Sequence, residues 1–144
     1  RNEFVGGFIG EPPMNFTIIY LVQDGEDYYI HSPSMRFKLD DQCKARFFEY
    51  TGGRKLKLGV RPEDVLVSLT PTANSFPMEV DFVEPQGDRT IITLKLEGDE
   101  FLLAQVLGDL RPTIGESVHI EFDQRHIHFF DVDSGINVLF TDSE

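Results

Sequence analysis

The second half of the chain is a series of short apolar runs, some of which alternate with polar residues, separated by turns at regular spacing. These runs lie at residues 78–83, 90–96, 101–106, 117–122, 127–132 and 136–139, and the turns between them contain Gly87, Gly98, Gly108, Gly115 and Gly135. Alternation with a period of two is typical of strands that are buried on one face. Several short strands at such spacing indicate a β-sandwich or a β-barrel. We therefore expect a mostly β fold with little helix.

The first half adds strands of the same kind. They are expected at residues 16–22, 28–31, 35–39, 55–60 and 65–69. The first two flank a polar turn at residues 24–27, which predicts a hairpin. In the fourth, Lys and Leu alternate, so Leu56 and Leu58 are expected to point inward. We expect all these strands to share one barrel-like body, with residues 28–55 as an insertion.

One or two short helices are expected between the strands. Asp40 and Asp41 offer an N-cap for a helix to about Tyr50, which the glycine pair 52–53 would close. Pro62 suits the first position of a single helical turn.

The start of the chain predicts a separate segment. Residues 3–9 are mainly apolar and indicate a short helical tail, and Pro12 and Pro13 prevent its continuation. We therefore expect a helical tail and linker over residues 1–15 and a β-barrel over residues 16–144.

Composition excludes several classes of partner. The 144 residues include 13 Lys and Arg against 25 Asp and Glu, a net charge of −12. That balance disfavours nucleic acid and direct contact with an anionic membrane surface. No apolar stretch approaches the length of a membrane span, so direct membrane insertion is not expected. Cys43 is the single cysteine, so the chain forms no internal disulfide, which fits a reducing cytosol.

The sequence contains none of the motifs that would predict catalysis. It has no phosphate-binding G-x-x-x-x-G-K-[ST] loop, no G-x-S-x-G elbow, and no H-E-x-x-H or C-x-x-C metal motif. The segment at residues 52–55 is rich in glycine and basic residues, but its spacing does not fit a phosphate loop. We therefore expect no catalytic and no cofactor-binding residues.

Three histidines are the candidate metal ligands. His126 and His128 are two residues apart on an expected strand and would share a face, and His119 lies on a neighbouring expected strand. Three imidazoles can bind zinc. The favoured alternative is that they are ordinary surface residues opposite the inward Ile127 and Phe129, so that the chain holds no metal.

Two segments together carry a resemblance to a known family. Residues 8–16, Phe-Ile-Gly-Glu-Pro-Pro-Met-Asn-Phe, resemble the exit from the nucleotide-binding domain in the ATP-binding subunits of maltose-type sugar importers. Residues 58–65, Leu-Gly-Val-Arg-Pro-Glu-Asp-Val, resemble the motif that opens a small β-barrel module called TOBE. The segments around Gly87 and at residues 125–131 resemble a later hairpin and the family's final strand.

The residues that match the family's motifs are expected to be structural. They are Phe8, Gly10, Pro13, Met14, Asn15, Phe16, Gly59, Arg61, Pro62, Glu63, Gly87 and Phe130. The chain departs from the family at Arg89, where the hairpin usually carries Glu. Residues 23–57 match none of the motifs.

The resemblance implies an OB-like or MOP-like barrel that regulates and dimerises an ABC importer subunit for carbohydrate uptake. ATP hydrolysis, with ATP and Mg²⁺, would belong to a nucleotide-binding domain outside this fragment. The partners it implies are a second copy, membrane-spanning permease subunits reached through that domain, and a regulatory protein. The implied location is cytoplasmic, peripheral to the inner face of the cell membrane.

A small-ligand sensor is the alternative function. A barrel cavity or dimer groove would bind a sugar, an oxyanion or a metal and regulate transport. The three histidines and the unmatched residues 23–57 motivate this hypothesis. Related molybdate-binding modules use oxyanion-cradling loops whose pattern is absent here, and the negative net charge disfavours oxyanions.

Overall fold

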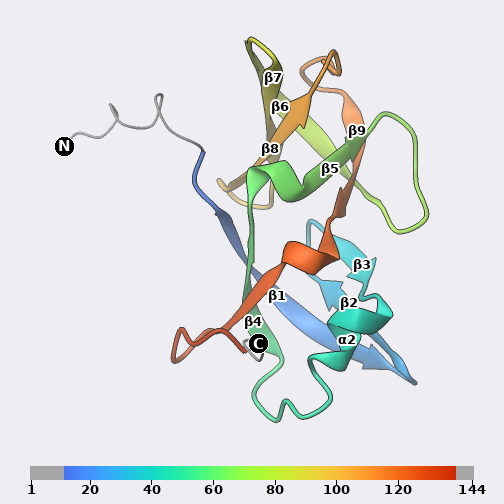
Figure 1. Ribbon diagram of the computed structural model, residues 1–144, viewed down its shortest axis with the longest axis vertical. Helices are drawn as coiled ribbons and strands as arrows, with labels where there is room; N and C mark the ends of the chain where they lie inside the picture. Colours follow the sequence, from blue (N-terminus) through green and yellow to red (C-terminus); the bar gives the residue numbers. More distant parts are fainter. Residues whose placement is uncertain (1–11, 139–144) are drawn as a thin grey trace, which may run out of the picture.

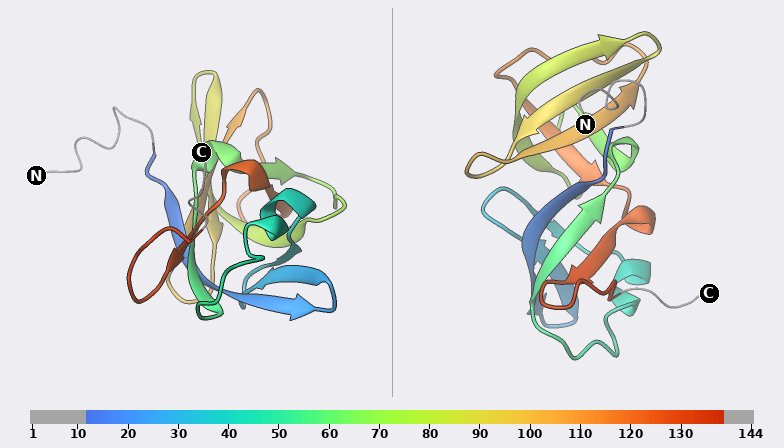
Figure 2. Two further views of the ribbon diagram at one scale, coloured as in Figure 1. Left: turned by 60° about the horizontal axis from the view of Figure 1, so that its bottom comes forward. Right: turned by 90° about the vertical axis from the view of Figure 1, so that its left-hand side faces the viewer.

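The computed structural model describes residues 12–138, which form two five-stranded antiparallel sheets (Figures 1 and 2). The first sheet has the order β10-β4-β1-β2-β3 and the second the order β5-β9-β6-β7-β8. The first contains β1 (Asn15–Asp24), β2 (Asp27–His31), β3 (Arg36–Lys38), β4 (Lys55–Val60) and β10 (His128–Asp131). The second contains β5 (Val65–Ser68), β6 (Phe76–Gln86), β7 (Arg89–Lys95), β8 (Phe101–Leu107) and β9 (Ser117–Phe122).

The chain passes between the sheets through two 3-10 turns. η1 (Pro62–Asp64) follows β4 and leads into β5, and η2 (Gln124–His126) follows β9 and leads into β10. In Figure 1 the second sheet lies above and the first below, with both turns at the level where they meet. The backbone N–H of Asp123 donates to the carbonyl of Asp64 at 2.9 Å, so the two crossings lie side by side.

A single hydrophobic core joins the two sheets. The expected alternation is present in β4, where Leu56 and Leu58 are fully buried. Between the sheets, the ring of Phe37 on β3 lies 5.9 Å from that of Phe76 on β6 and 5.4 Å from that of Phe122 on β9. Burying three aromatic rings in mutual contact contributes strongly to cohesion. The two sheets therefore behave as parts of one packed body.

Side-chain carboxamides add hydrogen bonds between segments from the two sheets. Asn74, in the loop between β5 and β6, accepts from the N–H of Lys38 at 3.0 Å and donates to its carbonyl at 2.8 Å. Gln124 on η2 donates to the same carbonyl at 2.8 Å and accepts from the N–H of Asp40 at 2.8 Å. Both amides imitate the pairing of an adjacent strand, so they hold β3 against the second sheet's connections.

Residues 28–55, expected as an insertion, supply β2, β3 and the helix α2 (Asp41–Ala45). Asp40 caps α2 as predicted, because its carboxylate accepts from the N–H of Cys43 at 2.8 Å. The expected extent of the helix was wrong, since it ends at Ala45 and not near Tyr50. Beyond it the backbone makes tighter i→i−3 bonds, including one from Phe47 to Lys44 at 2.9 Å. Phe47 is thereby placed in the core, 5.3 Å from the ring of Phe129.

Two further predictions concern the start of the chain and its last expected strand. Phe8 and Gly10 lie outside the described residues, so the helical tail and the division at residue 15 stay predictions. β1 starts at Asn15. The strand expected at residues 136–139 was wrong over its described part, where the single bridge is Phe130 to Asn137. None of the helices in the described range 12–138 is long and apolar enough to cross a membrane.

Candidate functional site at the junction of the sheets

Asn15 ties the first strand to both sheets. Its Nδ2 donates to the carbonyl of Val60 on β4 at 3.1 Å and to that of Leu103 on β8 at 2.9 Å. Its Oδ1 accepts from the N–H of Leu103 at 2.8 Å. The side chain is buried, and one amide thus satisfies three backbone groups. The beginning of β1 is therefore fixed to the edge of the second sheet as well as within the first.

Gly59 explains why three other motif residues lie close together. A Cβ at this position would lie 3.0 Å from Sδ of Met14, 3.0 Å from Cε1 of Phe16 and 3.2 Å from Cε2 of Phe130. The rings of Phe16 and Phe130 meet edge to face, with centroids 6.0 Å apart. Glycine therefore lets three side chains from β1, its leading segment and β10 pack directly over the backbone of β4.

The Arg-Pro-Glu motif builds η1. Arg61 is extended at the N-cap, and Pro62 occupies the start of the turn as predicted and is buried. Arg61 and Glu63 are exposed, whereas Asp64 is partly buried. The fixed φ of proline favours this conformation. The turn thereby directs the carboxylate of Asp64 toward the second crossing.

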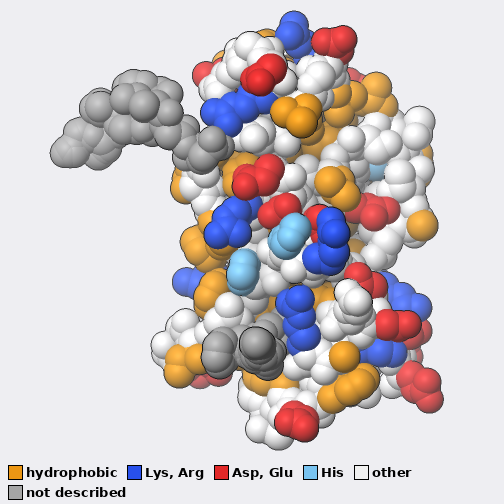
Figure 3. Space-filling model, in the orientation of Figure 1, with side chains coloured by type: hydrophobic (Ala, Val, Ile, Leu, Met, Phe, Trp, Pro, Cys, Tyr) orange, Lys and Arg blue, Asp and Glu red, His pale blue; other side chains and the backbone are white. Residues whose placement is uncertain are grey.

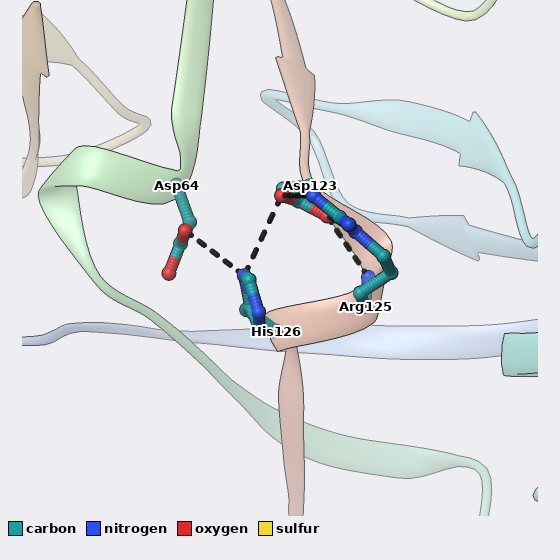
Figure 4. A network of polar contacts seen from close by, with 4 residues as sticks. All are labelled: Asp64, Asp123, Arg125 and His126. Carbon is teal, nitrogen blue, oxygen red and sulfur yellow. Dashed lines mark hydrogen bonds and ion pairs between the residues drawn. The ribbon is translucent and has the colours of Figure 1, made fainter.

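A cluster of two carboxylates and one imidazole lies at the two crossings and consists of Asp64, Asp123 and His126 (Figure 4). Nδ1 of His126 lies 3.1 Å from Oδ1 of Asp64 and 3.4 Å from Oδ2 of Asp123. Arg125 donates from Nε to Oδ1 of Asp123 at 3.0 Å and from a terminal nitrogen to Oδ2 at 2.8 Å. The side chains of Asp64 and Asp123 are only 14% and 18% exposed, and that of His126 is 51% exposed. Space-filling view shows histidines beside charges of both signs at the middle of this face (Figure 3).

Charge and burial shift the pKa values of two side chains in or beside this cluster, Asp123 and His128. The hydrogen bond from Arg125 lowers the pKa of Asp123, so this carboxylate is ionised at neutral pH. Desolvation lowers the pKa of His128, and the nearby positive charge of Arg61 adds to the effect. His128 is therefore neutral at pH 7, and its Nδ1 lies 3.4 Å from Nδ2 of Asn137.

The structure does not bring the three predicted histidines together. His126 lies in η2 and not on a strand, so the expectation that it shares a strand face with His128 was wrong. The reason is local: the carboxylate of Asp123 accepts from the N–H of Arg125 and caps a turn where a strand was expected. His119 lies on β9, paired with Ser68 and Pro77. It lines an open groove of about 300 Å³ with Leu66, Val67, Ser68, Thr72 and Glu121.

The sequence reasoning missed Asp64 and Asp123 as partners of His126. A signal for one of them was present, because an Asp followed by three polar residues at the end of a strand favours a capped turn. No local signal pairs Asp64 with His126, which are 62 residues apart. Of the other motif residues, Pro13 is exposed, and Gly87 has a φ of +76° in the turn between β6 and β7, far along the second sheet.

Residues 58–130 match the TOBE domain family. The chain belongs to this family. The match begins at Leu58, where the motif that resembles the opening of that module begins, and it ends at Phe130 on β10. The match therefore includes both crossings and the whole second sheet, together with the second half of β4 and most of β10 of the first sheet.

Similarity to known proteins extends over nearly the whole chain. It is 34% identical to the trehalose/maltose import ATP-binding protein MalK of Thermococcus litoralis, over 93% of this chain and 37% of that protein. It is 36% identical to the xylose/arabinose import ATP-binding protein XacK of Haloferax volcanii, over 94% and 34%. An sn-glycerol-3-phosphate import ATP-binding protein, UgpC 2 of Agrobacterium fabrum, is 29% identical over 93% and 34%. The chain spans about a third of the length of these relatives.

One solved structure supports the fold. The cytoplasmic molybdate-binding protein ModG, with molybdate bound, superposes with a TM-score of 0.55 at 15% identity, over 85% of this chain and 95% of that one. At this identity the likeness concerns the fold alone. It confirms the expectation of a mostly β, OB-like or MOP-like architecture.

Proposed function

We propose that the chain is the regulatory and self-association domain of the ATP-binding subunit of an ABC importer for carbohydrates. The alignment with the importer ATP-binding proteins over more than nine-tenths of the chain supports this function most directly. In this proposal the domain is not catalytic. ATP and Mg²⁺ are bound by a nucleotide-binding domain outside these residues, which also contacts the membrane-spanning permease subunits on the cytoplasmic side.

The role of the domain is to keep two subunits together while their nucleotide-binding domains separate. A second contact that persists raises the effective concentration of the separated domains, so the closed state re-forms at a lower entropic cost. The hydrogen bonds of the Asn15 side chain to Val60 and Leu103 support this role, because they fix the segment that leads into β1 to both sheets. In this proposal the surface through which the two copies associate also receives a regulatory protein, which then acts on both subunits.

Exposed apolar residues on the outer faces supply candidate contact surfaces. On β1, Phe16, Ile18 and Tyr20 are 51%, 41% and 44% exposed and alternate along one face. On β8, Phe101 and Leu107 are 51% and 75% exposed. Apolar side chains gathered on one face are typical of sites where proteins associate.

Sedimentation measurements test the proposal. We expect self-association of this chain at high concentration, and of the longer subunit without ATP. Ile18→Glu and Leu107→Glu each place a charge on the outer face of one sheet. We expect the variant that lies within the association surface to weaken association, and the variant on the other sheet to leave it unchanged as the matched control. Strictly monomeric behaviour of both the chain and the longer subunit would overturn the proposal.

A small-ligand sensor is the second candidate function. The groove that His119 and Glu121 line combines apolar walls with polar side chains, which suits a small ligand. A thermal-shift screen of sugars, oxyanions and divalent metals tests it, because a ligand that binds the native state raises its melting temperature. Saturable stabilisation that His119→Ala removes would support this function, and flat responses across the three classes would exclude it.

A further inference from the structure

The geometry points to a divalent metal site, which we assign to Asp64, Asp123 and His126, with zinc as the cation that fits it best. The three donor atoms come from the two crossings between the sheets and lie within 4.8 Å of one another. A metal here would join η1 to η2 directly. This inference does not depend on the proposed function.

The first argument is that two carboxylates converge on one ring nitrogen. Nδ1 of His126 carries at most one proton, yet two carboxylate oxygens point at it, at 3.1 Å and 3.4 Å. Among the described residues, His126 is the one hydrogen-bond partner of the Asp64 carboxylate. The hydrogen on Nδ1 can serve Asp64 while Oδ2 of Asp123 accepts from Arg125 at 2.8 Å, and one cation between the three atoms would bind both carboxylates and the ring nitrogen at once.

The second argument is distance. Zinc bonds of about 2.0–2.2 Å place neighbouring ligand atoms roughly 3–3.5 Å apart. Both distances from Nδ1 of His126 already fall in this range. The two carboxylates lie no more than 4.8 Å apart, so an approach of up to about 1.3 Å brings them within 3.5 Å and completes a three-ligand set of the kind that leaves a fourth position for water.

The third argument concerns charge and rigidity. The two carboxylates offer negative charge that a divalent cation can balance, and both are less than one-fifth exposed. The backbone hydrogen bond of 2.9 Å from Asp123 to Asp64 holds the two ligand-bearing residues together before any metal arrives. An imidazole and two carboxylates are ligands that zinc accepts readily.

Arg125 is the competitor at this site. Its guanidinium donates to Oδ2 of Asp123 at 2.8 Å, the oxygen that faces His126. The guanidinium is exposed, so it can move away, while its Nε bond to Oδ1 at 3.0 Å can remain and orient the carboxylate. Zinc therefore replaces one of the contacts of Arg125 with Asp123 and leaves the others in place.

Calorimetric titration of zinc chloride into the metal-free chain tests the assignment. We expect saturable binding of one zinc per chain, weakened at least about tenfold in His126→Ala and in Asp64→Asn. His119→Ala is the matched control, because it removes an imidazole that lies outside the cluster, and its affinity should equal that of the unchanged chain. Arg125→Gln should bind zinc more tightly, because it removes the competing cation.

Imidazole nitrogen NMR of the unchanged chain gives a readout that does not rely on variants that still fold. On zinc addition the Nδ1 resonance of His126 should shift, and its Nε2 should keep its proton. Absence of saturable binding, equal affinity in His126→Ala, or coordination through Nε2 would each overturn the assignment.

Discussion

At Gly59, the absence of a side chain decides how three larger side chains pack. Met14, Phe16 and Phe130 reach over the backbone of β4 so closely that a Cβ would lie only 3.0–3.2 Å from their side chains. This position does not require a positive φ, so the selection is steric and not conformational. The motif glycine is therefore a packing residue.

Gly59→Ala should lower the free energy of unfolding by about 1–3 kcal/mol, because overpacking forces the neighbouring side chains or the strand to shift. Urea unfolding monitored by circular dichroism measures the change. Gly53→Ala is the matched control, since nothing lies within 4 Å of a Cβ there, and it should be close to neutral. Equal losses in the two variants would contradict the steric explanation.

Cys43 is an inert thiol. Burial raises its pKa to about 12, and the side chain is 1% exposed. Because the thiolate is the reactive form, iodoacetamide should leave the native chain unmodified at pH 8 and should modify it in urea. Mass spectrometry distinguishes the two states. Rapid modification of the native chain would show that the region around α2 opens.

Sequence patterns predicted individual side chains where the cause is local. Leu56 and Leu58 are buried and Asp40 caps a helix, because alternation and capping act between near neighbours. His126 was misplaced because the cap from Asp123 interrupts the apolar pattern just before β10. The approach of Asp64 depends on the packing of two distant turns, which no local pattern encodes.

Among the structural elements, β1 has contacts in both sheets. It pairs with β2 and β4 in the first sheet, and Asn15 at its beginning bonds to Leu103 of β8. Asn74 makes the same two-point contact with the backbone of β3, but in an exposed setting. The two asparagines thus offer one geometry at two levels of burial.

Asn15→Ala should cost about 1–3 kcal/mol of unfolding free energy, because it leaves a buried backbone group of Val60 and partly buried ones of Leu103 without their side-chain partner. The amide of Leu103 should also exchange its hydrogen faster. Asn74→Ala should cost less than about 1 kcal/mol, since water can replace an exposed partner. Equal costs would contradict the importance of burial at Asn15.

The strands and their approximate bounds could be predicted from the sequence, but their partners could not. Alternation shows which residues of β4 face inward, yet it does not show that β4 lies between β1 and β10. The order depends on contacts between residues far apart in the chain, such as Phe129 opposite Leu58. The end of α2 was missed for a similar reason, because the burial of Phe47 against Phe129 overrides helix propensity.

At the scale of the whole molecule, the two sheets share one core. Phe37 from the first sheet packs against Phe76 and Phe122 from the second. Neither sheet can separate without exposing these rings to water. The connections at η1 and η2 lie beside this contact and are hydrogen-bonded to each other.

Thermal unfolding should therefore be a single cooperative transition. Calorimetry should give equal calorimetric and van't Hoff enthalpies, as expected for a two-state domain. Hydrogen exchange provides the second measurement: the amides of Leu58 in the first sheet and Leu94 in the second should open with the same free energy. Two resolved transitions, or a large difference between the two amides, would show that the sheets are independent.

The clamp at Asn15 also determines how the molecule would respond to force. The chain reaches β1 through Pro12 and Pro13, and within one further turn of backbone it is bonded to both sheets. A force or torque applied at Pro12 is therefore transmitted to both sheets at once, because little free backbone lies between Pro12 and the bonds of Asn15. The whole domain then rotates as one rigid body about the segment at residues 12–15. A small displacement there becomes a larger one at the surface of the domain that lies furthest from it.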